Sequence, residues 1–373
     1  KRVARRLPRI DLTSSNWPYG WIMFGALVLL IGGTVTFVSL VDDPFGGRPV
    51  TSVPISASRD TNPVARDIGS AETETPMIIG EQFPADAPAQ QEQNLGLVTG
   101  FSERELNDFG AYPQLLEETQ HGPVPHIGVN GERPFDAYAR ASVGPEAANG
   151  RPLIAIIVTG LGLNETATLN AISRLPDNVT LAFAPYGSGL KRAVAAAQAE
   201  GHEFWLEVPM EPFDYPESDP GPHTLLVNQP VRTNLDKLIW LMARFGGYAG
   251  IINNLGARFT STAGDFSPVM EEIGTRGLGY IDDGSSNRSV SRQLAAANRI
   301  PYARADENLD ASPSRPAILE ALQRLQDKAE AEGSAVGVVS ALPVSIDTLA
   351  AWAAEAESRG IILVPASALM QAP

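Results

Sequence analysis

Four carboxylates lie in two short stretches of the sequence, where a pair of them can supply acid–base chemistry. Glu207 and Glu211 are four residues apart, and Asp282 and Asp283 are adjacent. Two carboxyl groups in different environments can act as acid and base in glycosidic cleavage, so the catalytic candidates are Glu207, Asp282 and Asp283. The simpler alternative is that an aspartate at a strand end accepts a hydrogen bond from a loop amide. The run Asp282–Ser286 has too few spaced acidic ligands for a Ca²⁺ or Mg²⁺ site.

Amide, hydroxyl and guanidinium groups form a second set of candidates, for binding rather than catalysis. Guanidinium and amide donors suit the recognition of carboxylates or sugar hydroxyls, but the same side chains often brace loops, and both roles stay open. The ligand-binding candidates are Thr159, Asn253, Asn254, Arg258, Arg288 and Ser340.

Cysteine and histidine contribute little to the predicted site. The chain has no cysteine, which excludes disulfides, thiolate zinc sites and a cysteine nucleophile. Its four histidines are His121 and His126 in a Pro-rich region, His202 before an apolar run and His223 in a Pro-rich loop. A structural role is expected for His202. No metal or other cofactor is predicted.

The elements that position these side chains are short apolar runs alternating with helical patterns. The expected strands are 153–158, 179–183, 204–208, 250–253, 279–282, 302–305, 335–339 and 361–365, and the expected helices include 188–200, 235–245, 315–332 and 346–359. Eight β-then-α steps predict an α/β fold with a parallel sheet, open or closed into a barrel. In such a fold functional groups lie just past the carboxyl ends of the strands, which is where the candidates above lie.

Five motifs in this region carry a family resemblance. They are IAIIVTGLGLN, GHEFWLEVPMEP, GIINNLGARFT, GYIDDGSS and GSAVGVVSALPVSIDTL, in this order along the chain. From about Leu153 to Leu369 the sequence resembles the divergent polysaccharide deacetylases, relatives of chitin-oligosaccharide and peptidoglycan deacetylases. The resemblance implies a deformed (β/α) barrel of seven to eight parallel strands.

The resemblance also implies a metal site, whose ligands this chain has exchanged. Working members hold a divalent metal with one aspartate and histidines, and use a further aspartate as base. At the two aspartate positions this chain has Thr159 and Gly160, and at three histidine positions it has Glu207, Asn254 and Ser340. A metal that activates water needs about three basic N, O or S donors. We therefore expect no metal-dependent deacetylation.

An apolar segment near the N-terminus predicts a membrane anchor. Residues Trp21–Val41 contain no charged side chain, and about 21 helical residues at 1.5 Å each span a bilayer core of roughly 30 Å. Five basic residues precede the segment, whereas Asp42 and Asp43 follow it, so the N-terminus is expected in the cytoplasm. A cleavable signal peptide is the rival interpretation.

The segment after the anchor has the composition of a linker. Residues 42–150 hold 12 prolines and 17 acidic against 6 basic side chains, which predicts a mostly disordered chain. Within it, Glu103–Glu118 has a helical pattern, Gly131–Arg140 is expected to dock on the domain, and Tyr138 and Arg140 to pack. The expected division is a basic tail (1–20), a transmembrane helix (21–41), a linker (42–150) and a deacetylase-like domain (151–373).

The predicted function combines this placement with the altered pocket. A net charge of -15 gives no attraction for nucleic acid. We expect a single-pass protein of the bacterial inner membrane, with its C-terminal domain in the periplasm, that binds a glycan or peptidoglycan fragment or a protein partner without metal chemistry. The alternatives are an active deacetylase or hydrolase with a rearranged carboxylate site, and an envelope scaffold.

Overall fold

The computed structural model describes residues 106–107 and 109–370. The predicted anchor and most of the predicted linker lie outside them. Within the described residues, none of the helices combines the length and hydropathy that a bilayer span requires.

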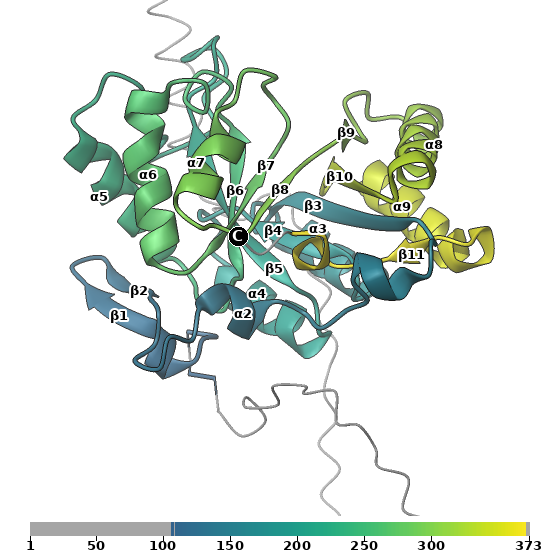
Figure 1. The fold of residues 1–373 in the computed structure, drawn as a ribbon, viewed down its shortest axis with the longest axis horizontal. Coiled ribbons are helices and arrows are strands. Elements are labelled where there is room, and N and C mark those ends of the chain that lie inside the picture. The colour runs from purple at the N-terminus through teal and green to yellow at the C-terminus, as the bar shows by residue number, and fades with distance from the viewer. Residues whose placement is uncertain (1–105, 108, 371–373) are drawn as a thin grey trace, which may run out of the picture. The chain divides into compact units, whose positions relative to one another are not determined.

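Apolar, largely β-branched runs form one parallel sheet (Figure 1). Its strands are β3 (Leu153–Leu161), β4 (Thr180–Phe183), β5 (Phe204–Met210), β6 (Gly250–Leu255), β7 (Gly279–Asp282), β8 (Tyr302–Arg304), β9 (Glu307–Asn308), β10 (Ser334–Ser340) and β11 (Ile362–Leu363). They are arranged in the order β8-β7-β6-β5-β4-β3-β10-β9, and β11 pairs with the first residues of β3. All eight strands expected from the sequence are present.

The two ends of the sheet belong to one extended stretch of chain. Tyr302 in β8 pairs with Tyr280 of β7, whereas Glu307 in β9 pairs with Gly337 of β10. Between them, the Ala305 amide still donates to the Asp282 carbonyl of the β7 side, at 2.8 Å. Residues 302–308 thus leave one edge of the sheet and join the other, and the parallel sheet curls into the deformed (β/α) barrel that was expected.

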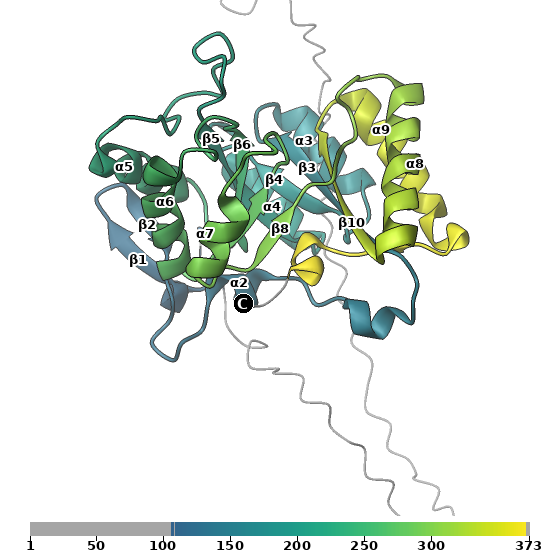
Figure 2. The ribbon, with the colours of Figure 1, turned by 45° about the horizontal axis from the view of Figure 1, so that its top comes forward.

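Helices follow the strands and cover the outside of the sheet (Figures 1 and 2). They are α3 (Glu165–Arg174), α4 (Leu190–Ala199), α5 (Val231–Met242), α6 (Ala263–Thr275), α7 (Ser291–Ala297), α8 (Arg315–Glu332) and α9 (Pro343–Ala356), with 3-10 turns η3 (Glu357–Arg359) and η4 (Ala366–Leu369). α3 begins where the Asn164 side chain accepts from the Ala167 amide, and α8 ends at Gly333, with φ 87°. The helices expected after β4, β5, β9 and β10 are confirmed.

Side chains alternate between two apolar layers along each strand. In β3, Leu153, Ala155 and Ile157 face the barrel interior, where they pack with Trp205 of β5. Ile154, Ile156 and Val158 join the larger core between the sheet and the helices. The period of two therefore decides which residue at a strand's end reaches the interior.

A segment assigned to the linker is folded against the barrel. It contains η1 (Pro113–Leu115), the hairpin β1 (Leu116–Thr119) and β2 (Gly122–Pro125), α2 (Pro134–Tyr138) and η2 (Pro145–Ala148). The prediction of disorder is wrong for residues 109–150, and the predicted helix over Glu103–Glu118 is replaced by η1 and β1 where the structure describes it.

Aromatic and polar contacts fix this segment to the barrel floor. The ring of Phe135 meets Trp205 edge-on, with centroids 6.3 Å apart. The Arg140 amide donates to buried Glu203, the residue just before β5, at 3.1 Å, and within the segment the Tyr138 hydroxyl accepts from the Tyr112 amide at 2.9 Å. The expected docking of Gly131–Arg140 and the packing role of Tyr138 are confirmed.

Candidate functional site

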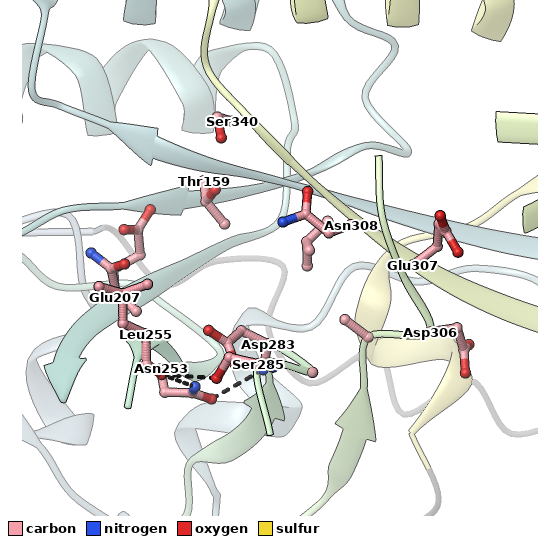
Figure 3. A pocket seen from close by; sticks show the side chains of 14 residues that line it. Thr159, Glu207, Asn253, Leu255, Asp283, Ser285, Asp306, Glu307, Asn308 and Ser340 are labelled. Carbon is pink, nitrogen blue, oxygen red and sulfur yellow. Dashed lines mark hydrogen bonds between the residues drawn. The ribbon is translucent and has the colours of Figure 1, made fainter. Parts of the chain in front are cut away.

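A polar layer closes the barrel interior at the carboxyl ends of the strands. Following the alternation that places Ile157, Trp205, Ile252, Ile281 and Val338 inside, the next inward positions are Thr159, Glu207, Asn254, Asp283 and Ser340. All five line one cavity of about 290 Å³ (Figure 3). Six of the predicted site residues meet at this cavity, because Asn253 also borders it.

Glu207 is the most deeply buried carboxyl of the cavity. Its side chain is 3% exposed, and its oxygen accepts a hydrogen bond from the Gly160 amide. Gly160 has φ 76° and lies at an irregularity in β3, a backbone conformation that glycine adopts without strain. Burial, opposed by the Gly160 amide and reinforced by the charge of Asp283, raises the pKa of Glu207 to about 8.

Asp283 is the second carboxyl of the cavity and differs from Glu207 in its surroundings. It accepts from the Ser285 amide at 2.9 Å, and its own amide donates to the Asn253 side chain at 3.1 Å. Burial raises the pKa of Asp283 to about 6. At neutral pH the cavity therefore contains a protonated Glu207 that can donate and an ionised Asp283 that can accept.

The two asparagines at the end of β6 have different roles. The Asn253 amide is fully engaged, accepting from the Tyr280 hydroxyl at 3.0 Å and donating to the Leu255 carbonyl at 2.6 Å. No described hydrogen bond holds the side chain of Asn254, which lines the cavity. Asn254 is thus able to bind a ligand, whereas Asn253 braces the loop that carries Asp283.

The third catalytic candidate, Asp282, lies outside the cavity. It is 1% exposed, and it accepts from the Gly284 amide at 2.9 Å and from the Ser291 hydroxyl. Arg304 lies 4.0 Å from its carboxylate. These contacts match the loop-bracing alternative, because no carboxylate oxygen is directed to the shared space.

The two predicted arginines also lie outside the cavity. Arg258 forms an ion pair with buried Glu211, with Nη1 and Oε1 2.7 Å apart, and Glu211 also accepts from the Val227 amide at 2.7 Å. The Arg288 guanidinium lies 5.0 Å from the centre of the Phe213 ring. Both side chains brace loops at the rim.

Sequence reasoning missed Asn308, whose side chain borders the same cavity. Its amide oxygen accepts from the Asp310 amide at 3.3 Å, which leaves the NH₂ group as a donor toward the cavity (Figure 3). Asn308 reaches the site only because residues 302–308 cross to β10, and no local pattern predicts that crossing.

The residues present do not fit a catalytic divalent metal. Among residues 106–107 and 109–370, no group of three or more histidine, cysteine, aspartate or glutamate side chains is placed to hold an ion. The residues at which the family resemblance implies metal ligands do converge, but apart from the Glu207 carboxyl they present only the Thr159 and Ser340 hydroxyls and the Asn254 amide. Such groups are poor donors for zinc-like ions.

The family assignment rests on a sequence model as well as on this geometry. The model of the divergent polysaccharide deacetylases matches residues 156–370. The chain belongs to this family. An uncharacterized protein of Agrobacterium tumefaciens has a solved structure with 42% sequence identity and a TM-score of 0.63, over 66% of this chain and 98% of that one. No curated protein matches the sequence.

Two solved deacetylases are more distant. A peptidoglycan deacetylase from Bacillus subtilis is 13% identical, with a TM-score of 0.35 over 60% of this chain and 91% of that one. The catalytic domain of a peptidoglycan N-acetylglucosamine deacetylase from Eubacterium rectale is 14% identical, with a TM-score of 0.36 over 60% and 93%.

Proposed function

We propose that this divergent polysaccharide deacetylase is a membrane-anchored, extracytoplasmic glycan-binding protein that does not carry out metal-dependent deacetylation. The observation that carries the proposal is the donor set of the cavity. At the family's metal positions it presents hydroxyl, amide and protonated carboxyl groups, which pair well with sugar hydroxyls and acetamido carbonyls and poorly with cations.

The lining suits a neutral polar ligand. The protonated Glu207 and the Asn308 amide can donate, the ionised Asp283 accepts, and the Asn254 amide can do both. Glu207 is buried, Asn254 and Asp283 are half-buried and Asn308 is exposed. A ligand that bonds these groups replaces the hydrogen bonds that water otherwise supplies, so their pattern of donors and acceptors selects the ligand. Family membership supports a glycan as that ligand.

Binding of N-acetylglucosamine tetrasaccharide to the full chain tests the proposal by calorimetry. Asn254→Ala should weaken binding about 5- to 50-fold, the loss of one or two buried hydrogen bonds. Asn170→Ala, an exposed asparagine of α3 without a side-chain bond, is the matched control and should leave affinity unchanged. No binding by the unaltered chain, or equal effects of both variants, would refute the assignment of the cavity.

A second candidate, hydrolysis by a rearranged carboxylate site, is favoured by one observation. The pKa values of Glu207 and Asp283 lie on opposite sides of neutrality, as in acid–base pairs. Release of acetate or of shorter saccharides from the same tetrasaccharide, abolished by Asp283→Asn, would establish this activity. Acetate release that requires stoichiometric bound metal would instead contradict the conclusion that the cavity does not fit a catalytic metal.

A further inference from the structure

A second groove lies between the loop after β4 and helix α5. It has a volume of about 570 Å³, and its walls include Tyr186, Lys191, His223, Trp240 and Arg244. None of these residues lines the cavity of Glu207 and Asp283. Burial, and after it the charges of Asp219 and Glu207, raise the pKa of the Tyr186 phenol.

Aromatic rings form one side of the groove. The His223 imidazole is stacked on the Trp240 indole, with centroids 3.9 Å apart and planes 16° from parallel. His223 has φ 63°. This left-handed conformation costs a non-glycine residue free energy, and residues that adopt it are often found at functional sites. The Tyr186 hydroxyl donates to the Pro222 carbonyl, which fixes the loop bearing His223. The rings are half-buried and border the groove.

Two cations flank these rings. The Arg244 guanidinium lies 4.1 Å from the centre of the Trp240 ring, and its other contacts are the carbonyls of Trp240 and His121, at 3.2 and 3.5 Å. Lys191 borders the groove as well. Neither has a carboxylate within 4.0 Å among the described residues.

The carboxylates of this neighbourhood are already engaged. Asp236 contacts His121 at 2.9 Å, and Asp219 accepts from the Gly221 amide at 2.9 Å. Asp219 keeps its charge, but neither of these carboxylates pairs with Arg244 or Lys191, so the charge of the two cations is available to a ligand.

We propose that this groove binds a carboxylate-bearing saccharide. The CH-rich face of a sugar ring is apolar and packs on aromatic side chains, and a guanidinium pairs with carboxylate oxygens through two parallel hydrogen bonds. The inference rests on the proposed function in that both sites take saccharides, but the groove is tested by ligands and variants of its own.

Tetragalacturonate, an acidic tetrasaccharide, tests the groove by calorimetry on the full chain, with neutral maltotetraose and inorganic phosphate for comparison. Arg244→Gln should weaken tetragalacturonate binding about tenfold or more, because a charge-assisted hydrogen bond is lost. Arg292→Gln is the matched control: its guanidinium lies 5.4 Å from the centre of the Tyr302 ring, on another part of the barrel. This variant should change affinity less than about twofold.

His223→Gly gives a second test that does not depend on charge. Glycine accepts the left-handed backbone, so the variant should fold while it removes the stacked ring, and tetragalacturonate binding should weaken. Three results would overturn the inference: no binding of tetragalacturonate, equal losses in the two arginine variants, or Arg244-dependent phosphate binding as tight as that of the saccharide. Unchanged N-acetylglucosamine tetrasaccharide binding beside any of these results would confine the failure to the groove.

Discussion

At the scale of single residues, partners decide what two neighbouring glutamates do. Glu207 and Glu211 are both buried, at 3% and 4% exposure. Glu211 is held by a guanidinium and an amide, whereas Glu207 receives one backbone amide and no described cation. One carboxyl thus stabilises the rim of the barrel, and the other remains a proton donor in the cavity.

The first prediction concerns the pH dependence that Glu207 imposes on stability. Its pKa is about 8 when folded, against an ordinary value of 4.5, so the folded state binds more protons between these values. The free energy of unfolding contributed by this group is therefore present below pH 4.5 and is lost as pH rises to 8. Glu207→Gln should become more stable relative to the unaltered protein by about 2–4 kcal/mol between pH 5 and pH 8.

Urea unfolding at a series of pH values measures this difference. Asp283→Asn should show the same trend over a lower and narrower interval, because the pKa of Asp283 rises only to about 6 from 3.8. A stability difference between Glu207→Gln and the unaltered protein that does not vary with pH would contradict the burial of an uncharged carboxyl.

A second prediction follows from the ion pair at the rim. Arg258→Ala leaves Glu211 buried without its cation, and the free energy of unfolding should fall by about 1–3 kcal/mol. Glycan affinity should not change, because Arg258 does not reach the cavity. Arg288→Ala, which removes an arginine stacked on the exposed Phe213 ring, is the control and should cost less than about 1 kcal/mol. If Arg258→Ala lost glycan binding while its stability was unchanged, Arg258 would be a ligand-binding residue after all.

The site was predictable as far as periodicity reaches. Parallel strands bring their carboxyl ends together, and alternation within each apolar run fixes Thr159, Glu207 and Ser340 as inward residues. Beyond the strand end the period is lost, so sequence alone did not separate Asp282 from Asp283. It also could not show that Arg258 turns to Glu211, because loop side chains follow contacts made far along the chain.

At the scale of elements, strand prediction succeeded because each buried strand is a continuous apolar run. The segment 109–150 has no such run. It is rich in proline and buries isolated side chains such as Ala111, Leu115 and Val124, and its order comes from the barrel floor. The composition of this segment shows that it cannot form a hydrophobic core of its own. A segment without its own core can still be ordered when it packs on another domain.

Phe135 gives the element-scale prediction. Its ring meets Trp205, and a side chain at Gly279 would contact it at 2.8 Å. Phe135→Ala should therefore lower the free energy of unfolding by about 1–3 kcal/mol and expose the chain just after α2 to cleavage by trypsin at Arg140. Phe213→Ala, whose ring is 54% exposed, should cost less than about 1 kcal/mol. Equal trypsin sensitivity of the two variants would argue against docking of the segment.

At the scale of the whole molecule, the sequence predicts a membrane anchor in a different part of the chain from the barrel. The Trp21–Val41 segment contains no charged residue and has the length of a bilayer span. The basic residues before Trp21 can add attraction for anionic headgroups, whereas the acidic chain after Val41 cannot. Stable membrane association should therefore depend on this segment, because the electrostatic attraction of a few basic residues is weak and reversible. The protein should sediment with bacterial inner membranes, and a variant lacking residues 21–41 should not.

Deletion of residues 61–81 is the matched control, because it removes the same number of residues from the linker and should leave sedimentation unchanged. Protease added to spheroplasts should digest the C-terminal domain of both the unaltered protein and this control, since the five basic residues before Trp21 favour a cytoplasmic N-terminus. A domain that resists protease until the inner membrane is opened would place the cavity on the cytoplasmic side, away from wall glycans. Sedimentation that persists without residues 21–41 would contradict the prediction and would assign membrane binding to the basic residues before Trp21 or to a protein partner.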